Sequence, residues 1–186
     1  IIDTRPSELF AAGRIPGARH FDPYFVNCDD TDPAPLASFT RMWANLLGWR
    51  GVKASDTIVF YGEFTDMCAA RSFWFAEYLG HERVHVLDGG VTAWTSAGMP
   101  LEDSGEPPIP VKYAHQIAAD RVATYTDILQ AKDNPDCIIL DNRSRAEFTG
   151  EDCRATHGGA IPTARHRDWV DLYDAATGCM RPASTL

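Results

Sequence analysis

The sequence predicts an α/β protein: a parallel β-sheet flanked by helices, repeated as two similar domains of which the second is incomplete. Three observations lead to this prediction. Short apolar runs alternate with helical patterns, similar blocks of sequence occur twice in the same order, and an acidic, proline-rich segment lies between the copies. Alternating strands and helices imply parallel strands, because each crossover helix packs on a face of the sheet.

Strand and helix patterns alternate through the first hundred residues. β-Branched and aromatic residues, which favour strands, cluster at residues 1–3, 57–61 and 84–87. Apolar residues at helical spacing predict helices at residues 6–12, 39–47 and 67–79, and a further helix after Gly89-Gly90 that continues through Trp94. This succession predicts an α/β unit in the first half.

The second half begins in the same way. Thr124 is followed three residues later by Asp127, a spacing that resembles a helix-capping pair. The apolar residues 137–140 predict a buried strand. Residues 102–110 between the halves are acidic, rich in proline and without apolar periodicity, which is typical of an exposed linker. We therefore expect domains at residues 1–101 and 113–186, joined by a linker at 102–112.

Composition excludes several classes of function. The chain has 186 residues, 45% of them hydrophobic, with 17 basic and 26 acidic residues and a formal net charge of −9. This charge disfavours nucleic acid as a partner, and no apolar run approaches the roughly 20 residues of a membrane span. The chain opens inside an apolar strand-like run, so the start looks cut. We expect a cytoplasmic protein, with a preceding targeting segment left open.

The five cysteines, Cys28, Cys68, Cys137, Cys153 and Cys179, are odd in number and form no Cys-x-x-Cys pair. They indicate a reducing compartment rather than a disulfide framework or a zinc site.

An internal repeat is the strongest signal. Asp3-Thr4-Arg5 matches Asp141-Asn142-Arg143 at an offset of 138 residues, and each triplet follows a short apolar strand. The Ile-Pro-x-Ala-Arg-His block at residues 15–20 matches residues 161–166 at an offset of 146. The second copy therefore carries an insertion of eight residues, around residues 151–157. A repeated α/β unit implies two similar domains.

Residues 3–5 and 13–18 (Gly-Arg-Ile-Pro-Gly-Ala) resemble the first signature of rhodanese domains. Residues 86–94 (Val-Leu-Asp-Gly-Gly-Val-Thr-Ala-Trp) and 97–101 resemble their closing signature, and Gly80-His81 also fits. Arg14 departs from the pattern where His is usual, as do Ala160 and Thr163 in the second copy. The resemblance covers nearly the whole chain and points to the tandem-rhodanese sulfurtransferases.

The resemblance implies a reaction without metal or organic cofactor. A cysteine thiolate takes sulfane sulfur from a small anionic donor, thiosulfate or less readily 3-mercaptopyruvate, and passes the resulting persulfide sulfur to a thiol or cyanide. The family places this cysteine in a loop directly after a central strand, where backbone N–H groups and a helix N-terminus favour an anion. In the first domain that position is Gly62, so the first domain is expected to be catalytically silent.

None of the five cysteines is expected to be the nucleophile. Cys68 lies six residues past Gly62, inside the following helix, where a small buried hydrophobe is the favoured interpretation. We place Cys137 in a strand core, Cys153 in the insertion and Cys179 in a surface turn. The second-domain loop falls beyond Leu186, so the fragment alone is expected to be inactive.

Four residues are candidates for substrate binding: Arg71, Asp141, Arg143 and Glu147. Arg143 follows a strand, at the sheet edge where α/β proteins bind ligands, and Asp141 could orient it. A purely structural Asp–Arg pair is an equal alternative, since Asp3 and Arg5 repeat it in the silent copy. Arg71 could face a cleft or pair with Glu63 or Asp66. Glu147 stands where mercaptopyruvate-using relatives carry Arg, which favours thiosulfate.

Two rivals stay open. One is a non-catalytic rhodanese module with a binding or regulatory role, which Gly62 supports for the first domain. The weaker rival is a phosphatase or arsenate reductase of related fold, which requires a Cys-x5-Arg loop that this sequence lacks.

Overall fold

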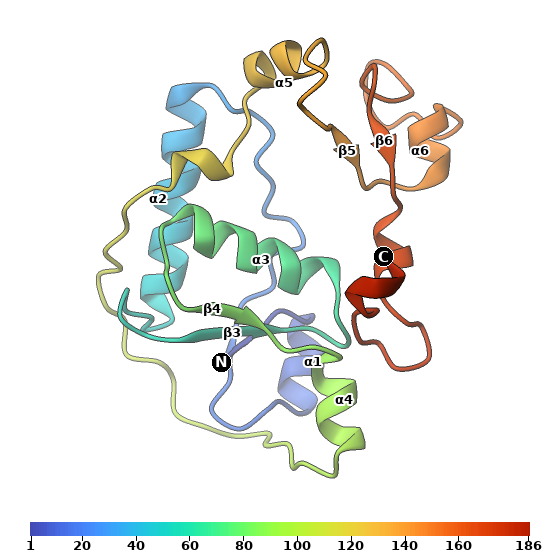
Figure 1. Cartoon of the computed structure of the whole chain (residues 1–186). Helices are drawn as coiled ribbons and strands as arrows, with labels where there is room; N and C mark the ends of the chain where they lie inside the picture. Colours follow the sequence, from blue (N-terminus) through green and yellow to red (C-terminus); the bar gives the residue numbers. More distant parts are fainter. The chain divides into compact units, whose positions relative to one another are not determined.

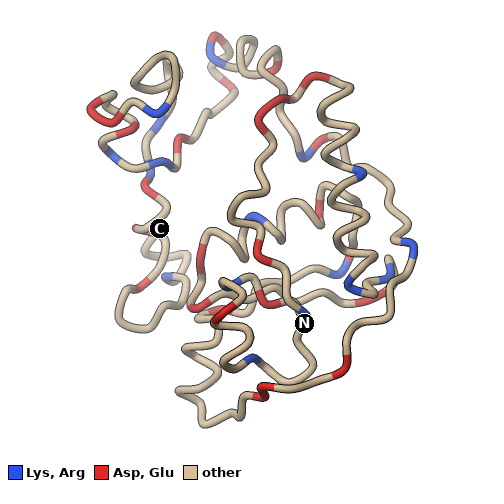
Figure 2. Tube along the Cα trace, turned by 180° about the vertical axis from the view of Figure 1, so that it is seen from behind, with Lys and Arg blue, Asp and Glu red and all other residues tan.

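The computed structural model describes residues 1–186 and separates them into two compact units. Unit 1 comprises Ile1–Val122 together with Ala175–Met180, and unit 2 comprises Ala123–Asp174 together with Arg181–Leu186. Each unit is described by itself. Acidic and basic residues are interspersed along the tube in both units (Figure 2). No helix is both long enough and apolar enough to cross a membrane.

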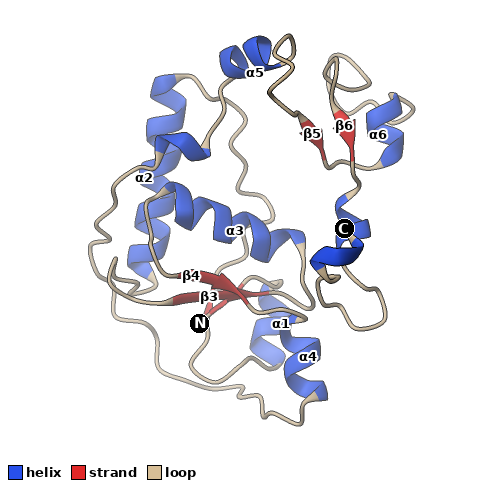
Figure 3. Ribbon diagram, viewed as in Figure 1, coloured by secondary structure: helices blue, strands red, loops and turns tan.

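Unit 1 is built on a sheet of four parallel strands in the order β2-β1-β3-β4. Helices α2 and α3 lie on one face of this sheet and helices α1 and α4 on the other (Figures 1 and 3). The strands are β1 (Ile2–Asp3), β2 (Arg19–His20), β3 (Ile58–Tyr61) and β4 (Val84–Val86). The helices are α1 (Ser7–Ala12), α2 (Pro33–Trp49), α3 (Met67–Tyr78), α4 (Gly90–Ser96) and the short 3₁₀ helix η1 (Ala119–Arg121).

Two apolar clusters fill the two faces of the sheet. On the α2–α3 face, the ring of Trp43 stacks on Phe75 with centroids 4.4 Å apart, above the buried strand residue Phe60. On the other face, Tyr61 packs with Ile15 and Val91. The side chains of Phe60 and Tyr61, which are neighbours in β3, thus point to opposite faces of the sheet, because side chains alternate along a strand. Burial of each large side chain contributes about 1.5–3 kcal/mol, so the sheet is held from both sides.

The predicted strands and helices of the first half are confirmed, while the short strand β2 was not predicted. The largest change of length is in α2. Helix α2 begins at Pro33 instead of residue 39. The apolar stripe starts only at Phe39, so the preceding turn left no periodic signal. Pro33 and Pro35 lie in the first turn, where backbone N–H groups have no partner within the helix and proline is therefore tolerated.

The chain beyond the expected linker stays attached to unit 1. Backbone N–H groups of Val111, Gln116 and Ala118 donate to carbonyls of Gly48, Leu79 and Tyr78, at 2.8–3.2 Å. Tyr113 is buried, and its hydroxyl lies 2.8 Å from Nδ1 of the buried His81. The compact unit therefore runs to Val122, whereas the composition marked residues 102–112 as the boundary. These hydrogen bonds involve backbone and polar groups, so the spacing of apolar residues in the sequence does not predict them.

A buried carboxylate joins three segments of unit 1. Asp3 is fully buried, and Arg5 donates to it from Nε and, at 2.8 Å, from Nη2. Arg5 also donates to the carbonyl of Gly13. The hydroxyl of Tyr61 donates to Asp3 at 2.6 Å and accepts the backbone N–H of Ile15 at 3.1 Å. The end of β1, the end of β3 and the segment before β2 thus meet at one carboxylate.

Unit 2 has a sheet of two parallel strands, β5 (Leu140–Asp141) and β6 (Arg165–His166). Its other elements are α5 (Tyr125–Ala131), α6 (Arg145–Thr149), and the 3₁₀ helices η2 (Trp169–Leu172) and η3 (Ala183–Thr185). The predicted capping pair is confirmed, because Thr124 and Asp127 form a reciprocal capping box at the start of α5.

The predicted buried strand at 137–140 needs correction. Only Leu140 belongs to β5, Cys137 is exposed, and Ile138 and Leu140 are 65% and 62% exposed. No residue of unit 2 is buried. The apolar composition of residues 137–140 predicts burial. The sheet of two short strands is too small to cover these side chains, so they stay exposed.

The sequence repeat corresponds to a repeat of individual contacts. The parallel pairing of β1 with β2 recurs in β5 with β6, at the same register relative to the repeat. Arg143 donates to Asp141 and to the carbonyl of Gly159, as Arg5 does to Asp3 and Gly13. His20 and His166 each approach the carbonyl of the equivalent arginine at 2.8 Å and each contact a phenylalanine ring. The insertion is accommodated between α6 and Gly159.

We predict that Tyr61→Phe lowers the free energy of unfolding of unit 1 by about 1–3 kcal/mol, because it removes the hydroxyl bond to the buried Asp3 carboxylate and leaves the Ile15 N–H without its partner. Urea denaturation followed by tryptophan fluorescence measures this. Tyr125→Phe is the matched control, since Tyr125 is 69% exposed, and it should change stability by less than about 0.5 kcal/mol. Equal effects of the two variants would contradict the proposed role of the hydroxyl.

Candidate functional site

The loop Gly62–Met67 occupies the carboxyl end of the central strand β3 and leads into α3. This is the edge of a parallel sheet where α/β proteins bind ligands. The sequence placed the loop here, and the structure agrees. Gly62 follows the strand directly and is buried. The loop therefore has the location that a nucleophile would need, but residue 62 has no side chain.

The carboxylate of Asp66 fills the space beside Gly62. A Cβ built on Gly62 would lie 1.6 Å from Oδ2 of Asp66 and 2.4 Å from its Cγ. Asp66 is the N-cap of α3 and accepts the backbone N–H of Ala69 at 3.0 Å. Backbone N–H groups of Cys68 and Glu63 also bond to it. Backbone N–H groups of the loop and of the start of α3 thus hold an internal carboxylate beside Gly62.

Both acidic side chains of the loop are engaged by other groups of unit 1. Asp66 itself is the bound anion: burial raises the pKa of its carboxyl, and the three backbone N–H groups oppose that increase. Glu63 turns to Arg5, with 3.3 Å between its Oε2 and Nη1. The role of Asp66 was missed from sequence, although an acidic residue just before a predicted helix is an N-cap signal.

Residues 175–180 cover the same loop. The N–H of Thr65 donates to the carbonyl of Gly178 at 2.9 Å, and the N–H of Met180 donates to Oδ1 of Asp88 at 2.7 Å. A Cβ on Gly178 would lie 2.6 Å from the Cβ of Phe64, and its φ of +69° also favours glycine. Cys179, expected in a surface turn, is half-buried against Gly89. This segment therefore closes the loop from outside.

Cys68 is in α3, as predicted, and is half-buried. It lines a cavity of about 390 Å³ together with Thr4, Asp22 and Tyr24. Burial raises the pKa of its thiol to about 11, and the charges of Asp66 and Asp22 raise it further against the opposing effect of Arg71. The thiol is therefore protonated at neutral pH and is a poor nucleophile.

The other cysteines also lack an activating environment. Cys137 is exposed and lies outside any strand, so its predicted position in a strand core is wrong for the reason given for residues 137–140. The Sγ atoms of Cys153 and Cys28 face backbone carbonyls, of Ala155 at 3.1 Å and Asp30 at 3.5 Å. None of the three contacts a base or a cationic group that would stabilise a thiolate.

Arg71 anchors the chain after β2. Its Nη1 donates to the carbonyls of Pro23 and Tyr24 and to Oδ1 of Asn27, at 3.1–3.2 Å. It forms an ion pair with neither Glu63 nor Asp66, the two partners considered from the sequence. All three acceptors belong to the loop after β2, so Arg71 holds this loop against α3.

The other three candidates lie together in unit 2. Arg143 Nη2 is 2.6 Å from Oδ2 of Asp141, and this pairing lowers the pKa of Asp141 and raises that of Arg143. Glu147 caps α6 with Ser144, and hydrogen bonds from Ser144 lower the pKa of Glu147. Arg143 and Glu147 thus carry structural bonds, while Arg143 keeps part of its side chain exposed. No group of three or more His, Cys, Asp or Glu residues is arranged to hold a metal ion.

Residues 1–97 match the family model described as rhodanese-like domain. The chain belongs to the rhodanese-like family. The matched part contains strands β1–β4, helices α1–α4 and the Asp3–Arg5 pair. The fold of unit 1 therefore agrees with the resemblance found in the sequence.

Several curated relatives are sulfurtransferases. The chain is 29% identical over 174 residues to thiosulfate sulfurtransferase of Azotobacter vinelandii, covering 94% of this chain and 64% of that protein. It is 32% identical over 146 residues to 3-mercaptopyruvate sulfurtransferase of Rattus norvegicus, covering 76% and 48%. The crystal structure of SseA, a 3-mercaptopyruvate sulfotransferase from Escherichia coli, superposes with a TM-score of 0.79 at 25% identity, covering 98% and 72%. The chain thus spans less than two thirds of the length of the Azotobacter and rat relatives.

We predict that Gly62→Ala and Asp66→Ala are strongly non-additive. Gly62→Ala destabilises unit 1 because its methyl group collides with the Asp66 carboxylate, and Asp66→Ala alone costs about 0.5–2 kcal/mol through loss of the helix cap. In the Asp66→Ala background the added methyl group no longer meets the three carboxylate atoms with which it would collide. A double-mutant cycle by urea denaturation should give a coupling energy of about 0.5–3 kcal/mol; purely additive effects would refute the steric argument.

We predict that Cys68 reacts slowly with iodoacetamide at pH 8, where only about a thousandth of a thiol of this pKa is ionised, and that its rate rises towards pH 11. Asp66→Asn should accelerate the reaction, since it removes a negative charge that raises the thiol pKa. Mass spectrometry of each cysteine measures both rates, with exposed Cys137 as the internal control. A Cys68 rate equal to that of Cys137 at pH 8 would contradict the assignment.

Proposed function

We propose that the protein carrying these 186 residues is a sulfurtransferase that moves sulfane sulfur from thiosulfate, less readily from 3-mercaptopyruvate, to a thiol or cyanide. One observation carries the proposal: the chain matches the rhodanese-like family. Relatives that align with 94% and 76% of this chain are named thiosulfate sulfurtransferase and 3-mercaptopyruvate sulfurtransferase. The repeated Asp–Arg–His contacts support two rhodanese-like domains in tandem. We keep residues 1–101 and 113–186 as the proposed domains, with the backbone of residues 111–118 bonded to unit 1.

The proposed reaction proceeds through a cysteine persulfide. The thiolate attacks the sulfane sulfur of thiosulfate, the sulfur–sulfur bond breaks, and sulfite leaves with the bonding electron pair. The acceptor then removes the outer sulfur and regenerates the thiolate. None of the five cysteines in these residues has the environment for this step, so we assign the nucleophile to sequence outside them, in the loop after the central strand of the second domain.

Unit 1 is assigned a supporting role in this proposal. Its loop carries Gly62 in place of a nucleophile and a carboxylate in place of a bound anion. In unit 2, Arg143 is the candidate for contact with the anionic donor, with Asp141 orienting it. Glu147 stands where mercaptopyruvate-using relatives carry an arginine for the substrate carboxylate, and a glutamate cannot pair with that carboxylate, so we propose thiosulfate as the preferred donor. Arg71 stays a weaker candidate, since its donors are used by the loop after β2.

The alternative is a non-catalytic rhodanese module with a binding or regulatory role, and the Gly62–Asp66 arrangement favours it for unit 1. The two proposals differ in one residue of the full gene. A cysteine directly after the central strand of the second domain supports the enzyme, and any other residue there supports the binding module. The reducing cytoplasm is the proposed location for either.

We predict that the 186-residue chain alone produces no thiocyanate from thiosulfate and cyanide, because Cys68 stays protonated and the loop lacks a nucleophile. A colorimetric thiocyanate assay measures this, with the full-length protein as the positive control. Thiocyanate formation by the 186-residue chain that disappears in Cys68→Ser would show that unit 1 is active. Absence of activity in the full-length protein would favour the binding module.

A further inference from the structure

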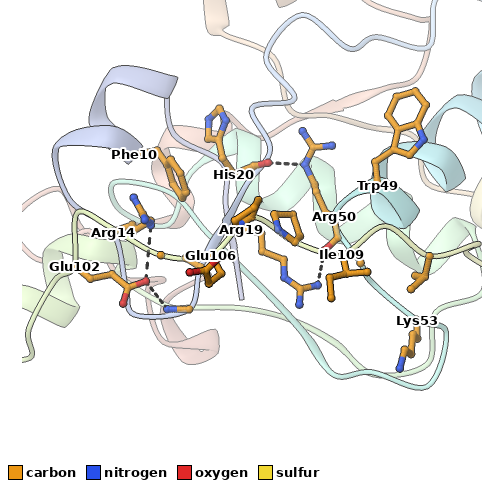
Figure 4. A pocket seen from close by; sticks show the side chains of 17 residues that line it. Phe10, Arg14, Arg19, His20, Trp49, Arg50, Lys53, Glu102, Glu106 and Ile109 are labelled. Carbon is orange, nitrogen blue, oxygen red and sulfur yellow. Dashed lines mark hydrogen bonds and ion pairs between the residues drawn. The ribbon is translucent and has the colours of Figure 1, made fainter.

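Unit 1 contains a second cavity, of about 900 Å³, that the proposed sulfur transfer does not use. It lies between strand β2, the C-terminal end of α2 and residues 102–111 (Figure 4). Arg19, Arg50 and Lys53 line it, and we call these three residues the cationic triad. The chain as a whole has nine more acidic than basic residues, so a local excess of positive charge here runs against the overall balance.

The cationic triad has no carboxylate partner. Arg19 donates through Nη1 to the carbonyl of Arg50, and Arg50 donates to the carbonyls of His20 and Leu46. These bonds join β2 to the end of α2 but neutralise no charge. The ammonium of exposed Lys53 has no hydrogen bond or ion pair, since Asp56 accepts only its backbone N–H. Three positive charges thus border one cavity without counter-ions.

The acidic residues of the cavity do not replace those counter-ions. Glu102 accepts the N–H of Gly17 at 2.9 Å and lies 3.8 Å from Arg14, so its charge is already engaged. Glu106 is exposed and forms no hydrogen bond or ion pair with the cationic triad. Burial lowers the pKa of the Arg50 guanidinium, which stacks on the Phe21 ring at 4.6 Å. A desolvated cation without a counter-ion is unfavourable, and an anion in the cavity would relieve that cost.

The cavity also has an apolar part. Trp49, at the end of α2, is 60% exposed, and Ile109 is 83% exposed. Both line the cavity with the cationic triad (Figure 4). Exposed large apolar side chains beside unpaired arginines favour a ligand with an anionic head and a flat apolar body. Guanidinium groups match the geometry of oxyanions, and an indole ring provides a stacking surface.

We propose that this cavity binds a small organic molecule that carries a phosphate- or sulfate-like oxyanion next to a flat apolar group, with the oxyanion at the cationic triad and the apolar group at Trp49. This assignment is independent of the proposed sulfur transfer, because it uses none of the loop 62–67 or the candidate residues of unit 2. Arg19 and Arg50 also hold β2 to α2, so Lys53 is the residue whose charge is free for a ligand.

Phenyl phosphate is the probe, with inorganic phosphate and phenol as its two halves. Calorimetric titration of the whole chain should give saturable binding of phenyl phosphate, weaker binding of inorganic phosphate and no measurable binding of phenol. Lys53→Glu should weaken phenyl phosphate binding by at least about tenfold, a change of about 1.4 kcal/mol. Lys112→Glu is the matched control, since it makes the same charge change on an exposed lysine of unit 1 that does not line the cavity.

Two further variants separate the contributions. Trp49→Leu should reduce the affinity for phenyl phosphate to that for inorganic phosphate, and Glu106→Gln should strengthen binding of both. Circular dichroism checks that each variant is folded. The proposal is overturned if phenyl phosphate does not bind saturably, if Lys53→Glu and Lys112→Glu weaken it equally, or if phenol binds as well as phenyl phosphate, which would make the cavity merely apolar.

Discussion

The buried carboxylate of Asp3 is the contact on which unit 1 depends most. It is fully buried at the end of β1 and is neutralised by Arg5, two residues along the chain. The hydroxyl of Tyr61 completes its hydrogen bonding from β3. A buried charge is tolerated only when it is paired and hydrogen-bonded, so these three groups must be placed together. That requirement sets the alignment of β1 and β3 and positions the loop that follows Tyr61.

The same Asp–Arg pair in unit 2 has a different environment. Asp141 and Arg143 reproduce the geometry of Asp3 and Arg5 through local contacts, including the arginine bond to a glycine carbonyl. No strand equivalent to β3 and no counterpart of Tyr61 covers them in these residues, and Arg143 remains 44% exposed. The contacts of Arg143 with Asp141 and Gly159 thus repeat those of Arg5 with Asp3 and Gly13.

The loop after β3 illustrates how an anion-binding position can be filled from within. Backbone N–H groups at the start of a helix attract negative charge, and in unit 1 the Asp66 side chain supplies it. Gly62 and Asp66 are a matched pair, because the carboxylate occupies the volume that a side chain at residue 62 would need. The bonds from residues 178 and 180 close the loop further.

Much of the fold was accessible from the sequence, because it is encoded in local patterns. Strand composition predicted β1, β3 and β4, apolar spacing predicted α1, α3 and α4, and the repeated Asp-x-Arg and Ile-Pro-x-Ala-Arg-His blocks predicted a second copy whose contacts recur one by one. The absence of a nucleophile at Gly62 was also evident from sequence alone. The buried strand predicted at residues 137–140 was wrong. Apolar composition shows that a segment can be buried, but burial also requires neighbouring elements that cover it.

Contacts between distant segments were decided by the tertiary structure. The position of the Asp66 carboxylate beside Gly62, the attachment of residues 111–118 to α2 and α3, and the packing of Cys179 on Gly89 all depend on backbone placement that no local pattern encodes. The cationic triad is the same kind of feature, since Arg19 and Lys53 lie far apart in the chain and meet only where β2 approaches the end of α2. Sequence determined which elements form and what chemistry each residue could offer. The fold determined which of those groups are brought within contact, because hydrogen bonds and charges act over a few ångströms in space, whatever the separation along the chain.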